Sequence, residues 1–178
     1  NTNQTPTATV QSVTGSEDNP LSITLSGSDA DGDVLTYALV TQPSNGTAIV
    51  DGSTVTYTPA ANYNGSDSFS FNVSDGAATS SAATVSITIT AVNDVPTATA
   101  QSVSGNEDAS QTITLSGSDG DGDALTYALA SNPSHGSASL SGSTVTYTPN
   151  SDYNGSDSFT FTVSDATGRT SSASTVSI

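Results

Sequence analysis

The chain repeats one sequence of about 90 residues, and this repeat is the strongest constraint on its fold. A shift of 90 positions aligns residues 5–75 with residues 95–165 without a gap, and 48 of those 71 positions are identical. After Asp165 the second copy holds one extra residue, so that residues 84–87 then match residues 175–178. Because exposed loops tolerate length changes, this insertion marks a surface loop.

The repeat divides the chain into two domains. A unit of about 90 residues is long enough to fold as one domain, so we predict the first domain over residues 1–92 and the second over residues 93–178. The linker covers about residues 91–96. Pro96 would interrupt a strand ladder there, which favours a break between domains.

Apolar residues alternate with small polar residues through most of each copy. Phe69, Phe71 and Val73, for example, are separated by Ser70 and Asn72. This period of two is that of half-buried antiparallel strands, and no helical period competes with it. The first copy is predicted to contain seven strands, over residues 6–13, 20–27, 33–41, 46–50, 53–58, 66–74 and 81–90.

Turn residues separate the predicted strands. Asp51-Gly52 has the composition of a tight type I′ hairpin, while Asn64-Gly65 and Asp75-Gly76 close two other loops. Seven short strands in about 90 residues are typical of a Greek-key β-sandwich. We therefore predict an all-β chain of two tandem seven-stranded Greek-key Ig-like sandwiches arranged end to end.

An odd number of antiparallel strands makes the chain enter each sandwich at one end and leave it at the other. We call the end of entry the upper end of a repeat and the end of exit its lower end. The loop of residues 29–33 and the loop of Asp75 are then expected at the upper end. The loop of Glu17 and Asp18 is expected at the lower end, beside the outgoing linker.

The charge of the chain is strongly negative. It carries 17 acidic residues against a single basic residue, Arg169, and its net charge is −16. This balance argues against nucleic acid as a partner, because phosphates require Lys and Arg, and against an anionic membrane surface. No apolar run approaches the 18 residues of a membrane span, and no cysteine is available for disulfides or thiolate metal sites. Cations are the natural partners.

Most of the acids fall in the predicted loops and form candidate metal ligands. Between the two copies, the lower end of the first repeat is expected to meet the upper end of the second. The side chains expected to converge there are Glu17, Asp18, Asn93, Asp94, Asp119, Asp121, Asp123 and Asp165. Further candidates are Asp67 and the first-copy acids Asp29, Asp31, Asp33 and Asp75.

The chemistry of these candidates favours Ca²⁺. Clustered carboxylates repel one another without a counter-ion, and hard oxygen ligands without His or Cys suit Ca²⁺, which takes ~6–8 oxygens. Mg²⁺ usually keeps more of its water and ranks second. Asp and Gly also dominate ordinary turns, so solvated loops without a metal are the alternative interpretation.

Four segments resemble the cadherin-like bacterial Ig-type repeat of large RTX-type and biofilm adhesins. They are the Glu-Asp pair near residue 17, LSGSDxDGDxLTY, TYTPxxxYNGSDSFxFxVSD and VNDVP. The resemblance spans both copies. It implies secreted, extracellular spacer repeats on a bacterial surface that take part in cell adhesion and contact neighbouring repeats of the same chain. Host or biofilm glycans or proteins would then be bound through other domains.

The weaker similarity to true cadherins implies calcium ligands between successive domains. By that resemblance, the ligands would be Glu17, Asn93, Asp94, Asp119, Asp121 and Asp165. The acidic motif that cadherins carry before their sixth strand is missing here, and Asp67 is only a loose substitute for it. Gln4 stands where the second copy has Asp94, which predicts a weaker upper site in the first repeat.

No enzyme is predicted. The single histidine, His135, replaces Asn45 of the first copy before a glycine and is interpreted as a turn residue. The alternative function is a carbohydrate-binding module that accompanies a polysaccharide-degrading enzyme. All ten aromatic residues occur in matched pairs, and most are predicted to face the core. Tyr63 and Tyr153 are the exceptions and are interpreted as a corner at the lower edge or as a contact surface.

Overall fold

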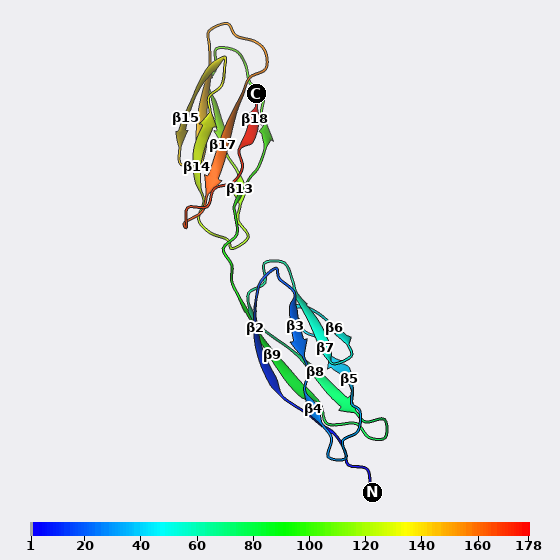
Figure 1. Ribbon diagram of the computed structural model, residues 1–178. Coiled ribbons are helices and arrows are strands. Elements are labelled where there is room, and N and C mark those ends of the chain that lie inside the picture. Colours follow the sequence, from blue (N-terminus) through cyan, green and yellow to red (C-terminus); the bar gives the residue numbers. More distant parts are fainter. Residues whose placement is uncertain (1) are drawn as a thin grey trace. The chain divides into compact units, whose positions relative to one another are not determined.

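The computed structural model describes residues 2–178 and divides into two compact units. The first unit ends at Val92 and the second begins at Asn93. Each is a sandwich of short strands, as Figure 1 shows, and no helix occurs in the described part of the chain. Accordingly, residues 2–178 hold no apolar helix of the length needed to cross a membrane. The predicted all-β fold with two tandem sandwiches is confirmed.

Repeat 1 contains two main sheets. One has the order β2-β9-β8-β5 and the other the order β3-β7-β6. The strands of the first sheet are β2 (Gln11–Ser16), β9 (Ala83–Thr90), β8 (Gly65–Ser74) and β5 (Thr36–Thr41). Those of the second are β3 (Leu21–Thr24), β7 (Thr54–Pro59) and β6 (Gly46–Asp51). A separate pair joins β1 (Thr7–Ala8) to β4 (Gly27–Ser28).

The structure refines two of the predicted strands. The segments 6–13 and 20–27 are each divided in two, so that the first half of one pairs with the second half of the other. The remaining half of the first segment, β2, runs parallel to β9, although antiparallel pairing was expected throughout. This follows from the direction of the chain, since both strands run from the upper to the lower end.

Side-chain alternation explains the core. Along β9 every second residue is buried, and Val85, Ile87 and Ile89 are the inward positions. Phe71 in β8 and Tyr57 in β7 fill the space between the two sheets and are fully inaccessible. The outward positions are Ser and Thr, which pair across the sheet without apolar burial. The period of two therefore sets both the fold and the register.

Repeat 2 repeats this plan. Its sheets have the orders β11-β18-β17-β14 and β12-β16-β15, beside the pair β10-β13. Strand β11 runs parallel to β18, as β2 runs parallel to β9 in repeat 1. The bounds are β10 (Thr97–Ala98), β11 (Gln101–Ser102), β12 (Gln111–Thr114), β13 (Gly117–Ser118), β14 (Thr126–Ser131), β15 (Gly136–Ser141), β16 (Thr144–Pro149), β17 (Ser158–Ser164) and β18 (Ser174–Ser177).

The hairpin between β6 and β7 differs in detail from the prediction. Asp51 pairs with Thr54, so the two central residues are Gly52 and Ser53 rather than Asp51 and Gly52. Only Gly52 has a positive φ, +59°. A two-residue loop with glycine at its first position is of type II′, not the predicted type I′.

Candidate metal centres

The loop between β4 and β5 is organised around Asp29. Its Oδ1 accepts the backbone N–H groups of Asp31, at 2.8 Å, and of Asp33, at 3.3 Å. Gly32, with a φ of +82°, allows the sharp bend that this arrangement requires. As a result, Asp29, Asp31 and Asp33 each present a carboxylate oxygen, and these oxygens lie within 4.8 Å of one another.

The incoming chain meets this loop at the upper end of repeat 1. The backbone N–H of Gln4 donates to Oδ2 of Asp31 at 2.7 Å. The side-chain amide of Asn3 donates to Oδ2 of Asp75 at 3.0 Å. The hydrogen bond from the backbone of Ala78, followed by that from Asn3, lowers the pKa of Asp75. The incoming segment thus contacts the carboxylates of two loops that lie far apart in the sequence.

Repeat 2 makes the same arrangement. Oδ1 of Asp119 accepts the N–H groups of Asp121, at 3.0 Å, and of Asp123, at 3.3 Å. The N–H of Asp94 donates to Oδ2 of Asp121 at 2.7 Å. The amide of Asn93 donates to Oδ2 of Asp165 at 2.9 Å. These hydrogen bonds connect the linker of the second unit to the loop of Asp119 and to Asp165.

Asp165 is the most strongly perturbed acid of this cluster. It is 5% exposed, and the desolvation that would raise its pKa is outweighed by hydrogen bonds from Asn93, from Thr167 and from the backbone of Arg169. The resulting pKa is about 2, so the group is ionised at neutral pH. The guanidinium of Arg169 donates to the backbone oxygen of Asn93 at 2.6 Å.

One oxygen in each cluster receives no hydrogen bond from residues 2–178. These oxygens, Oδ2 of Asp29 and Oδ2 of Asp119, are both buried. An unpaired buried carboxylate oxygen is costly, because it loses its water without gaining a partner. Both copies place this oxygen in a loop with two further carboxylates. A hard divalent cation would supply the missing interaction, so the residues present fit Ca²⁺.

The lower end of repeat 1 holds the other predicted acids. Glu17 is 1% exposed; its Oε1 accepts the N–H of Val92, and its Oε2 lies 3.4 Å from the amide of Asn64. Oδ1 of Asp18 accepts the N–H of Asn62 at 2.9 Å. Both acids hold the lower loops of the first unit together. That they join the acids of the second unit in one site stays a prediction.

Asp67 has a different environment. Its carboxylate accepts the backbone N–H groups of Ser44, Asn45 and Ser68 and the hydroxyl of Tyr57. Burial would raise the pKa of Asp67, but these four hydrogen bonds together lower it. Because its oxygens are used inside the domain, we leave Asp67 out of the proposed metal site.

Repeat 2 contains the same group around Asp157, and the sequence analysis missed both. The hydroxyl of Tyr147 donates to Asp157 at 2.9 Å, and burial, then this carboxylate, raises the pKa of Tyr147 to about 12. The available signal was a tyrosine and an aspartate ten residues apart in both copies. The group anchors the loop before β15 to the core.

The aromatic residues agree with the core prediction. Tyr57, Phe69, Phe71 and their counterparts in the second repeat are buried. Tyr63 is partly buried, and its hydroxyl donates to the backbone oxygen of Ser66 at 2.6 Å, which closes a loop. The His135 ring is exposed and stacks on Tyr153, with ring centres 4.2 Å apart. The carboxylate of Asp157 accepts the backbone N–H of His135 at 3.0 Å, so this contact does not involve the imidazole ring.

Known proteins resemble the chain mainly in fold. The EC1-2 fragment of human mucin-like protocadherin superposes with a TM-score of 0.55 at 15% identity, over 98% of this chain and 97% of that one. An endo-fucoidan hydrolase of glycoside hydrolase family 107 gives a TM-score of 0.44 at 24% identity, and the chain spans 28% of its length. No curated protein matches.

The family assignment comes from the sequence of each repeat. Residues 3–88 and 93–178 each match the bacterial Ig domain, so the match covers nearly the whole chain in two copies. Domains of this family are typically non-catalytic, and no catalytic family is indicated. The chain therefore belongs to the bacterial Ig domain family and carries two tandem members of it.

Proposed function

We propose that these repeats are extender modules of a secreted bacterial surface adhesin, and that Ca²⁺ bound at the upper end of a repeat rigidifies the linker that enters it. The observation that carries the proposal is the buried, unpaired Oδ2 of Asp29 and of Asp119. In both copies it belongs to a loop that the incoming linker already contacts. Bacterial Ig domains are commonly extracellular surface modules, which agrees with this role.

The ion would be held by side chains from three segments of one repeat. In repeat 2 these are Asn93, Asp94, Asp119, Asp121, Asp123 and Asp165. Bound Ca²⁺ supplies positive charge and a shared ligand sphere, so that the linker and two loops become one unit. Without it, the linker is attached by a few hydrogen bonds alone.

Such a site would be occupied by Ca²⁺ in the extracellular medium. Extracellular calcium modules typically bind at ~10⁻⁴–10⁻³ M. Binding to the folded state stabilises it by mass action, by ~2.7 kcal/mol when the ion exceeds its Kd a hundredfold. The repeats would therefore stiffen outside the cell. The net charge of −16 also discourages lateral association.

The alternative carbohydrate-binding role receives less support from the described residues. Sugar sites usually require an exposed aromatic platform, whereas most of the aromatic rings here lie in the two cores. Tyr63 and Tyr153 both use their hydroxyl groups to close a loop. A spacer repeat, by contrast, requires an apolar core and a polar surface but no exposed aromatic platform.

Calorimetry of the whole chain in millimolar Ca²⁺ and in EGTA tests the proposal. Calcium should raise the melting temperature by about 10 °C, and the double variant Asp119→Asn/Asp121→Asn should lose this gain in repeat 2. Asp51→Asn/Asp152→Asn is the matched control, because it removes the same charge from exposed positions outside both clusters. Identical curves with Ca²⁺ and EGTA would refute the proposal.

A further inference from the structure

A groove opens between the edge strands of the two sheets, at the same place in each repeat. In repeat 1 it is lined by residues 35–37, at the start of β5, and by residues 50–53, at the β6–β7 hairpin. In repeat 2 it is lined by the equivalent residues 125–127, 140, 142 and 143. The volumes are about 560 Å³ and about 500 Å³. Because both copies form it, the groove belongs to the domain and not to one repeat.

Each wall of the groove is the outer edge of a sheet. Strand β5 is the last strand of the sheet β2-β9-β8-β5, and β6 is the last strand of the sheet β3-β7-β6. The sheets of repeat 2 end in the same way, with β14 and β15. An edge strand carries a row of main-chain N–H and C=O groups that can pair with another chain. Ig sandwiches of the variable type place additional strands beside the strand that corresponds to β5.

The regular part of the β5 edge is short. The pairing of β5 with β8 shifts its register between Leu39 and Thr41, and β14 has the equivalent shift between Leu129 and Ser131. Such bulges bend an edge strand and disturb further pairing along it. Regular pairing is therefore open along residues 36–39, the part of the strand that begins at the groove, and this length suits a short peptide.

The floor of the groove is apolar and incompletely covered. Tyr37 and Val50 pack against the core of repeat 1, yet both side chains stay partly exposed. Tyr127 and Leu140 take the same positions in repeat 2. A strand laid over these side chains would remove their remaining apolar area from water, which favours its binding.

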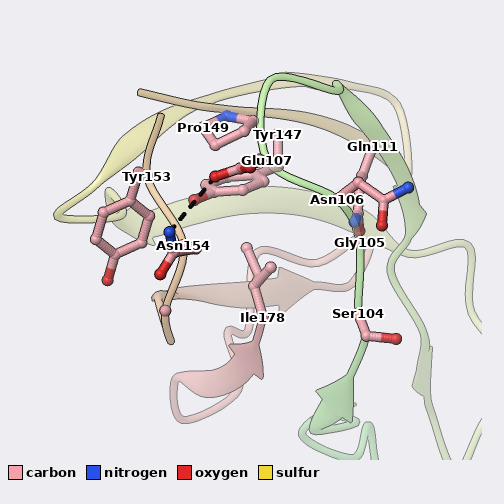
Figure 2. A pocket seen from close by; sticks show the side chains of 11 residues that line it. Ser104, Gly105, Asn106, Glu107, Gln111, Tyr147, Pro149, Tyr153, Asn154 and Ile178 are labelled. Atoms are coloured by element: carbon pink, nitrogen blue, oxygen red, sulfur yellow. Dashed lines mark hydrogen bonds between the residues drawn. The ribbon is translucent and has the colours of Figure 1, made fainter. Parts of the chain in front are cut away.

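The tyrosine hydroxyl of each groove is available to a ligand. Among residues 2–178, the hydroxyls of Tyr37 and Tyr127 have no hydrogen-bond partner. Tyr147 and Tyr153 differ; they line another pocket of about 230 Å³, shown in Figure 2. Their hydroxyls already donate to Asp157, at 2.9 Å, and to a main-chain oxygen, at 2.8 Å. A phenol hydroxyl both donates and accepts, so it can bind either main-chain group of a peptide.

The charge around the groove favours a cationic ligand. Asp51 lines the groove of repeat 1 and is exposed, and the exposed Asp33 lies two residues before Leu35. The chain carries a net charge of −16, and its single basic residue is Arg169 in the other repeat. A segment with Lys or Arg is therefore favoured over a second copy of this chain, which has the same negative charge.

A sugar suits the groove less well than a strand does. Stacking on a sugar requires an exposed aromatic face, whereas Tyr37 is partly buried, with its ring centre 6.3 Å from that of Phe71. A sugar would also leave the main-chain groups of the β5 edge without a ladder partner.

We propose that the groove between β5 and β6 is a docking site for an extended, positively charged peptide segment of a partner protein. The segment extends the sheet beside β5 by β-augmentation, with main-chain hydrogen bonds giving affinity. One of its aliphatic side chains covers Tyr37 and Val50, and a neighbouring Lys reaches Asp51. Ser141 replaces Asp51 in repeat 2, so a cationic segment binds more weakly there. The repeats would thus carry a partner along the spacer in addition to extending it.

The test is a titration of the ¹⁵N-labelled whole chain, in EGTA, with the peptide acetyl-Lys-Val-Thr-Val-Lys-amide. The amide signals of Tyr37, Gly52, Tyr127 and Gly142 should shift, whereas that of Val85 in the central strand β9 should not. Binding to repeat 1 should be about two- to fivefold tighter than binding to repeat 2, which is the worth of an exposed ion pair. Absence of shifts at millimolar peptide would overturn the inference.

Two control peptides separate strand addition from charge attraction alone. Pro in place of the central Thr keeps the charge and both valines but removes a main-chain donor, so it should bind about tenfold more weakly or worse. Asp in place of both Lys should weaken binding to a similar extent, because the chain then repels the peptide. Equal binding of the Thr and Pro peptides would show that no strand is added and would overturn the inference.

Matched variants test the assigned residues. Asp51→Ser should lower the affinity of repeat 1 about two- to fivefold, and Ser141→Asp should raise that of repeat 2 by a similar factor. Tyr37→Phe should weaken binding to repeat 1 about two- to fivefold without changing the melting temperature, since its hydroxyl has no partner inside the domain. Unchanged affinities in all three variants would contradict the assignment.

Two other occupants would be recognised directly. A dimer detected by light scattering without peptide, with the same amide signals shifted, would assign the groove to a second copy of the chain. Shifts of these signals by cellohexaose but not by the peptide would assign it to a sugar. Either result would overturn the inference, and neither depends on calcium.

Discussion

The upper ends of the two repeats share one backbone arrangement but carry different charges. In both, an asparagine of the linker donates to the late aspartate, and the next residue donates its N–H to the middle aspartate of the loop. That next residue is Gln4 in repeat 1 and Asp94 in repeat 2. Repeat 2 also carries Arg169, the single basic residue of the chain.

The shared features define the backbone scaffold of the site, whereas the residues that differ are expected to set its affinity for calcium. The buried, unpaired oxygen occurs in both copies, so it belongs to the scaffold. The extra carboxylate of Asp94 should favour a cation, whereas the guanidinium of Arg169 on the Asn93 oxygen should oppose one. Two repeats of similar sequence can therefore differ in calcium affinity because of the residues at two positions, Asp94 and Arg169.

The largest expected effect tests whether the two repeats share one packing scheme. Phe71 and Phe161 are both fully inaccessible in their cores. Phe71→Ala and Phe161→Ala should each lower the free energy of unfolding of the affected repeat by about 3–5 kcal/mol. Chemical denaturation followed by NMR would assign the loss to one repeat. If either variant unfolded both repeats, the two repeats would not be independently stable units.

A second effect concerns the group around Asp157 and its dependence on pH. Hydrogen bonds lower the pKa of Asp157 in the folded state against the opposing effect of burial. Its contribution to stability is therefore complete above about pH 4, the unfolded value, and is lost as the pH falls through the lower folded value.

Asp157→Asn should accordingly cost about 2 kcal/mol at pH 7 and progressively less below pH 4. Asp67→Asn is the matched variant in repeat 1, where four groups at the equivalent positions donate hydrogen bonds to the Asp67 carboxylate. Denaturant titrations between pH 2 and pH 7 would measure both. A constant difference across this range would show that the carboxylate charge is not the stabilising feature.

Exchanging the linker residues should transfer calcium affinity between the repeats. Asp94→Gln removes one ligand charge from repeat 2 and should weaken calcium binding there about five- to tenfold, close to 1 kcal/mol. Gln4→Asp should strengthen binding in repeat 1 by a similar factor. Calcium titrations followed by the amide signals of each repeat would resolve the two. If neither exchange changes the affinities, the linker side chains lie outside the site.

The smallest effect is expected at Arg169. Its side chain is exposed and donates a hydrogen bond to the Asn93 oxygen, so Arg169→Ser should change stability by less than about 1 kcal/mol. Calcium affinity of repeat 2 should nevertheless rise about two- to threefold, because a nearby positive charge is removed. Weaker calcium binding in this variant would show that Arg169 supports the site instead of opposing it.

The strand pattern was predictable from the sequence because it depends on local alternation. Residues such as Phe69, Phe71 and Val73 face one side of a strand whatever the rest of the domain does. The position of the acids at the upper ends followed from strand direction alone. The division of the first predicted strand at Thr9 and Val10 was not predictable, since it depends on pairing between β1 and β4.

Other features needed three-dimensional contacts. Asp67 lies near a turn in the sequence, but its four donors come from three separate segments that only the folded domain brings together. The burial of Glu17 depends on Val92, 75 positions away. The unpaired Oδ2 atoms of Asp29 and Asp119 could not be predicted from the sequence either. In the folded loops the backbone N–H groups donate to Oδ1 of each residue instead.

The most direct measurement is an isothermal calcium titration of the whole chain, together with Asp29→Asn and Asp119→Asn. The wild-type chain should bind calcium at ~10⁻⁴–10⁻³ M at both upper ends. Each variant should lose binding at its own repeat and keep it at the other. Absence of binding heat at ~10 mM Ca²⁺, an upper margin on that range, would contradict the account, as would two variants that bind like the wild type.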